Sequence, residues 1–135
     1  MSTTSAAIAA PKTLADAIDV IEEAYEFMLA YAAQGRRGGD EEDAGSGIRE
    51  RLVRAEAALA VIRSATAEEI GGAETADFLK VLKQDAAQAR AAFRFVIAQH
   101  ALGSQIIDNL NALTHVRTLL TDLFLLDEAL KISGV

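Results

Sequence analysis

The stretch Ile21–Tyr31, IEEAYEFMLAY, places three glutamates among the only two tyrosines of the chain. Around it, apolar residues recur in steps of three and four, which is the spacing of one face of an α-helix. This row is Leu14, Ile18, Ile21, Tyr25, Met28 and Ala32, and a second row beside it is Val20, Ala24, Phe27 and Tyr31. At ~100° per residue the two rows cover more than half of the circumference. A helix from Thr13 to about Gly35 therefore needs at least two neighbours.

Three further segments repeat this spacing and predict three more helices. They cover 48–64, 75–102 and 104–132, with breaks at 35–47, at Thr66–Gly72 and at Gly103. The apolar stripes predicted for these three helices are Ile48, Leu52, Ala55, Leu59 and Ile62; then Leu79, Leu82, Ala86, Ala89, Phe93, Val96 and His100; and last Ile106, Leu110, Leu113, Val116, Leu120, Leu123 and Leu130. Gly103 is expected as the C-terminal glycine of the third helix. The pattern predicts an all-α, antiparallel four-helix bundle of up-down-up-down topology. An alternative makes Gly103 a kink within one long helix from Thr75 to Ile132.

The chain is predicted to form one domain, because 135 residues suffice for a single sizeable core. Residues 1–11 are expected to be a flexible N-terminal tail, and 12–135 the helical-bundle domain. Within that domain the polar, glycine-rich segment 35–47, GRRGGDEEDAGSG, is expected to be a mobile linker.

The composition of the chain excludes some classes of function and argues against others. The absence of cysteine excludes disulfides, thiolate nucleophiles and cysteine-ligated zinc. A net charge of −7 argues against nucleic acid and against anionic membrane surfaces as partners. No apolar run reaches the ~18 residues of a transmembrane helix, and no basic n-region marks a secretory signal. A cytoplasmic location is the resulting expectation, and no cofactor is predicted.

The glutamates of the opening stretch are interpreted as a solvated face. On a helical wheel they share an arc with other acids, opposite the row of Ile18, Ile21, Tyr25 and Met28; the full set is Asp16, Asp19, Glu22, Glu23 and Glu26. Metal-binding carboxylates in bundles point inward and usually accompany a Glu-x-x-His, which this chain lacks. No metal site is therefore predicted here.

Two acidic pairs nevertheless resemble a pattern of the all-α nucleotide pyrophosphatases. These are Glu23-x-x-Glu26 and Glu74-x-x-Asp77, and the resemblance is limited to these four positions. In that family such pairs hold magnesium, a hard cation that prefers several carboxylate oxygens. The resemblance implies a magnesium-dependent nucleotide hydrolase, which is kept as an alternative function.

Arg117 is the most informative polar residue, because the pattern places it on the apolar seam of the fourth helix. A buried arginine needs an acidic partner or a bound anion. Asp85 is the expected partner, and an anion held mid-bundle by Arg117, with the Tyr25 hydroxyl nearby, is the alternative. His100 falls on the apolar stripe of the third helix and His115 on a polar row of the fourth; neither is predicted to be a ligand.

The leading functional hypothesis is a non-enzymatic bundle that acts through protein–protein contact. A monomer is expected to leave apolar side chains uncovered on the first and last helices, and exposed patches of that kind usually mark interfaces. The predicted interface residues are Phe27, Tyr31, Leu119, Leu125 and Leu126. The expected partners are a second copy of the chain and, alternatively, another protein. A small-molecule or anion sensor near Arg117 is the second hypothesis.

Overall fold

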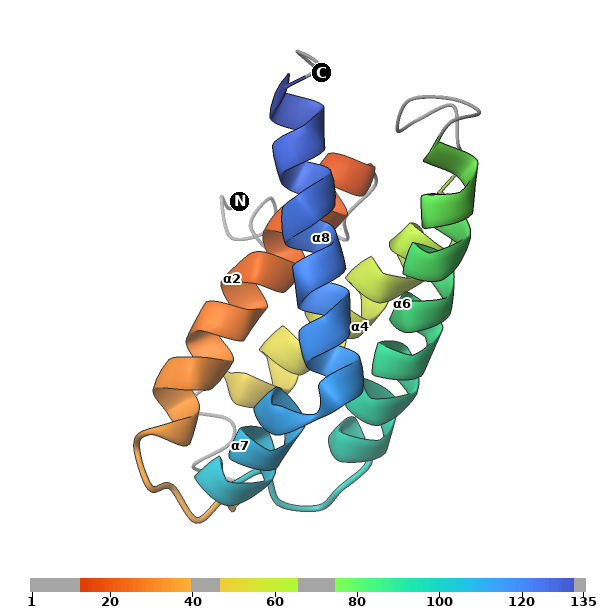
Figure 1. Ribbon diagram of the computed structural model, residues 1–135. Coiled ribbons are helices and arrows are strands. Elements are labelled where there is room, and N and C mark those ends of the chain that lie inside the picture. The colour runs from red at the N-terminus through yellow and green to blue at the C-terminus, as the bar shows by residue number, and fades with distance from the viewer. Residues whose placement is uncertain (1–12, 40–46, 66–74, 133–135) are drawn as a thin grey trace, which may run out of the picture.

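The computed structural model describes residues 13–39, 47–65 and 75–132, and in these ranges the regular structure is helical, with no strand. The described residues contain five helices in this order: α2 (Leu14–Ala32), α4 (Ile48–Arg63), α6 (Ala76–Ile97), α7 (Ser104–Ala112) and α8 (Thr114–Ile132). They form a bundle in which α2 packs on α4, α4 on α6 and α6 on α8 (Figure 1). The prediction of an all-α helical bundle is confirmed.

Helices α2 and α4 begin where the sequence predicts. The Thr13 side-chain oxygen accepts a hydrogen bond from the Asp16 amide at 3.1 Å, which is an N-cap. α4 begins after Gly47, whose φ of 75° suits glycine. Its predicted narrow stripe is buried throughout: Ile48, Leu52, Ala55, Leu59 and Ile62. α2 ends at Ala32, three residues before the expected Gly35.

The third helix ends earlier than predicted, at Ile97 rather than near Leu102. The Arg49 guanidinium of α4 explains the early end, because it donates to the carbonyl oxygens of Ile97 and Gln99. These carbonyls would otherwise lack partners at a helix C-terminus. The chain then crosses from α6 to α7, so the alternative of one continuous helix through Gly103 is wrong.

Gly103 is not a left-handed helix cap either, since its φ is −82°. The position requires glycine because the backbone of Arg37 passes close by. A Cβ atom built on Gly103 would lie 2.6 Å from the Arg37 carbonyl oxygen. Ser104 joins the same two segments, its amide donating to the Arg36 carbonyl while its hydroxyl accepts from the Arg36 amide, both at 2.8 Å. The described start of the predicted linker is therefore attached to the α6–α7 loop. Residues 1–12, 40–46 and 66–74 lie outside the described residues, and with them the predicted tail, most of the predicted linker and the predicted break at Thr66–Gly72.

The predicted fourth helix is two helices. Leu113, expected on the buried seam, has extended dihedral angles (φ −60°, ψ 131°) and is 41% exposed. α7 packs mainly against α2, whereas α8 packs mainly against α6. Because of the break, α7 and α8 pack against different helices. The residues of α8 that face the core therefore differ from those expected for one unbroken helix.

Candidate protein interface on helix α8

Helix α8 has a sharply divided surface. Its inward side is buried and made of Val116, Leu119, Leu120, Leu123 and Leu126. On the other side, Phe124 is 49% exposed and Leu125 61% exposed, and Ile132 at the end of the helix is 81% exposed. In Figure 1, α8 lies nearest the viewer with α4 behind it, so its outward side faces away from the bundle. This side is the candidate interface.

Arg117 lies on this outward side and is exposed, which corrects its predicted position on the buried seam. The prediction counted one unbroken helix from Ile106 onward, and the break at Leu113 invalidates that register. Arg117 borders an open surface groove of about 360 Å³, together with Thr114, Thr118, Thr121 and Asp122. Among the described residues it forms no ion pair.

Asp85 interacts with a carboxyl group rather than with the expected arginine. Burial, followed by a side-chain hydrogen bond with Asp85 and the charge of Asp85, raises the pKa of Asp122 to about 7. The Oδ2 atom of Asp122 is buried and has no hydrogen-bond partner among the described residues. Near pH 7 the Asp122 carboxyl group is therefore only partly ionised at the α6–α8 contact.

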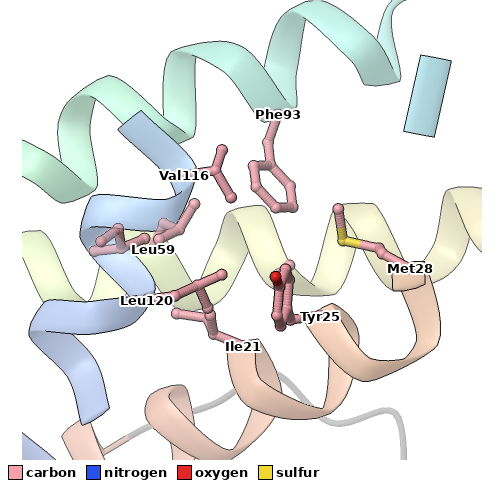
Figure 2. A pocket seen from close by; sticks show the side chains of 9 residues that line it. Ile21, Tyr25, Met28, Leu59, Phe93, Val116 and Leu120 are labelled. Carbon is pink, nitrogen blue, oxygen red and sulfur yellow. The ribbon is translucent and has the colours of Figure 1, made fainter. Parts of the chain in front are cut away.

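The surroundings of Tyr25 do not suit an anion, because Tyr25 lines an apolar pocket between helices. The pocket has a volume of about 10 Å³, close to that of a single water, and its other lining residues are apolar. Figure 2 shows Ile21, Phe93 and Leu120 around it. Arg117 is not among the lining residues, so the structure does not bring together Tyr25, Asp85 and Arg117.

Three of the five predicted interface residues are buried within one chain: Tyr31 (1% exposed), Leu119 (1%) and Leu126 (4%). Tyr31 donates its hydroxyl to the Leu102 carbonyl, a contact that the α6–α7 loop makes possible. Phe27 is half-buried, stacked on Tyr31 and covered by the Arg51 guanidinium at 4.2 Å from the ring centroid. Leu125 is the one predicted interface residue that is freely exposed.

The three described members of the two acidic pairs are exposed. Glu23 forms an exposed ion pair with Arg51 at 3.3 Å, and Glu26 and Asp77 are exposed, while Glu74 lies outside the described residues. In the described ranges no three His, Asp or Glu side chains gather as a metal site would require. His100 is exposed in the loop after α6, not on its apolar stripe, and His115 is exposed on α8.

Sequence reasoning missed a second feature, a basic groove where residues 36–37 meet α7. The open groove has a volume of about 460 Å³ and is lined by Arg36, Arg37, Ala101, Gly103, Gln105, Ile106 and Asn109. The signal in the sequence is the Arg36-Arg37 pair, which lies within the segment predicted to be a linker. Its attachment to the α6–α7 loop depends on Gly38 and Gly103, and no local pattern encodes that approach.

Comparison of the chain with protein-family models, curated proteins and solved structures gives no match. None of the described helices has the length and apolarity needed to cross a membrane. Functional inference therefore starts from the surface features described above.

Proposed function

We propose that the chain is a non-enzymatic helical bundle that acts through protein–protein contact and assembles with itself. In this proposal α7 and α8 together take the place of the fourth helix in an up-down-up-down bundle. The observation that carries it is the outward side of α8, where Phe124 is 49% exposed and Leu125 is 61% exposed. Four of the eight large exposed apolar side chains in the described residues belong to α8 or to Leu113 just before it.

Physical reasons connect this surface to association. Large apolar side chains on a soluble protein gain free energy when a partner removes them from water, at roughly 25 cal/mol per Å². Aromatic residues such as Phe124 are enriched in interfaces for this reason. The inward side of α8 is already filled by leucines, so the outward side is available for a partner.

A second candidate function is the binding of a small anion in the groove of Arg36 and Arg37. Two arginines beside the amide of Gln105 and the side chain of Asn109 offer several hydrogen-bond donors in a protein that is otherwise acidic. This replaces the sequence-based anion site at Arg117.

Thermal unfolding separates the two candidates. Self-association stabilises the folded chain by mass action, so the midpoint should rise with protein concentration and should not respond to magnesium, nucleotides or phosphate. A midpoint that is independent of protein concentration but rises with phosphate would favour the anion-binding candidate and contradict the first proposal.

A further inference from the structure

The outward side of α8 carries a continuous stripe of exposed residues at helical spacing. The stripe is Leu113, Arg117, Thr121, Phe124, Glu128 and Ile132, and each of these six residues is exposed. Successive members are four, four, three, four and four positions apart. At ~100° per residue this spacing keeps the five members within α8 on one side of the helix. Leu113 directly precedes the helix, and its carbonyl accepts a hydrogen bond from the Arg117 amide at 3.0 Å.

The stripe is also symmetric about its centre. Leu113 and Ile132, Arg117 and Glu128, and Thr121 and Phe124 are three pairs with the same midpoint, between Asp122 and Leu123. When two identical helices pack antiparallel about a two-fold axis, each residue meets the residue on the other side of the midpoint. An antiparallel pair of α8 helices centred there would place apolar ends against each other and oppositely charged residues together.

The two charged members are free to form such contacts. Neither Arg117 nor Glu128 has an ion pair within the part of the chain that the structure describes. In a parallel arrangement each would face its own copy, which places like charges together and is unfavourable. The charge pattern therefore favours one orientation of a second copy over the other.

We propose that two copies of this chain pair through antiparallel α8 helices, with Arg117 of each copy opposite Glu128 of the other. Phe124 and Thr121 lie next to the two-fold axis, and Leu113 packs near Ile132 of the second copy. The inference rests on the proposed self-association and specifies its surface, orientation and register. At 19 residues, α8 is about 28 Å long, so the interface is small and its affinity should be micromolar.

Charge reversal with complementation tests this register. Arg117→Glu places an acidic group opposite Glu128, and Glu128→Arg places a basic group opposite Arg117. Each single variant should raise the dimer dissociation constant at least about tenfold, because two attractive contacts become repulsive. An equimolar mixture of the two single variants should dimerise again, since both contacts then join opposite charges. The double variant should also dimerise.

Arg63→Glu is the matched control, because it changes the net charge equally at an exposed position on α4. It should leave the dissociation constant within about twofold. Sedimentation equilibrium of all six samples, the unmodified chain included, over a concentration series through the micromolar range gives the readout, with circular dichroism to confirm folding. If the single variants dimerise like the unmodified chain, or if their mixture stays monomeric, the antiparallel α8 register is overturned while self-association stands. If the unmodified chain is itself monomeric, the proposed function fails as well.

Discussion

At the scale of single residues, Asp122 gives the folded chain a defined pH response. Its pKa is about 7 in the folded state, because burial and Asp85 disfavour its charge, against an ordinary value of 3.8. Between pH 3.8 and about pH 7 the folded state therefore binds more protons than the unfolded state. The contribution of this group to stability is fully present below about pH 4 and is lost as the pH rises through about 7.

Asp122→Asn should remove this loss, because the amide is uncharged and can still donate a hydrogen bond to Asp85. We expect the free energy of unfolding to rise by roughly 1 kcal/mol at pH 8, after allowance for solvent screening, and to change little at pH 4. Urea unfolding at both pH values measures the difference. An equal loss of stability at both would show that the carboxyl group makes a contact that the amide cannot replace.

Gly38 tests the attachment of residues 36–38 to the α6–α7 loop. Its φ is 79°, and an added Cβ would lie 2.5 Å from the Gly103 amide nitrogen. Gly38→Ala should cost about 1–3 kcal/mol through backbone strain and displacement of the loop. Gly39→Ala is the matched control, because a Cβ there meets no atom within 4 Å. Chemical denaturation that finds the two variants equally stable would contradict this close packing.

These residues mark where sequence reasoning reached its limit. The N-cap at Thr13 is a local signal and was predictable. The Asp85–Asp122 pair and the Gly38–Gly103 approach join segments far apart in the chain, so no local spacing reports them. Arg117 was misplaced for a related reason, because its face depends on a helix break several residues away.

At the scale of elements, the two sides of α8 should differ strongly in their contribution to stability. Leu123 is fully buried and Leu125 is 61% exposed. Leu123→Ala should cost 2–5 kcal/mol, the usual range for removing a buried leucine side chain. Leu125→Ala should cost less than about 0.5 kcal/mol at concentrations where the chain is monomeric. Urea denaturation of both variants makes the comparison, and similar losses would mean that the assigned faces of α8 are wrong.

Helical spacing predicted which residues of α4 and α6 are buried, because each is one regular helix with one apolar stripe. Between residues 104 and 132 it placed Leu110, Val116, Leu120 and Leu123 correctly, and all four are buried. It misplaced Leu113 and Arg117, because the apolar steps continue through Leu113 although the helix does not. The segment Asn111–Thr114 contains neither glycine nor proline, so it carries no conventional break signal. The break follows from tertiary packing, with α7 on α2 and α8 on α6.

At the scale of the whole molecule, the central proposal is that the chain self-associates through the outward side of α8. The sequence led to the same functional hypothesis through a different set of residues, most of which the fold buries. Tyr31, Leu119 and Leu126 were predicted interface residues because a monomer was expected to lack room for them. The bundle buries these three residues. The exposed apolar surface is instead the outward side of α8, at Phe124 and Leu125.

Sedimentation equilibrium of three proteins tests this claim most directly: the unmodified chain, Phe124→Glu and Val53→Glu. Phe124 and Val53 are matched in exposure, at 49% and 47%, but Val53 lies on α4. The account predicts that the unmodified chain and Val53→Glu approach twice the 14.3 kDa of one chain at protein concentrations well above the micromolar dissociation constant. Phe124→Glu should stay near 14.3 kDa. A monomeric unmodified chain, or a Phe124→Glu variant that assembles as well as Val53→Glu, would contradict the account.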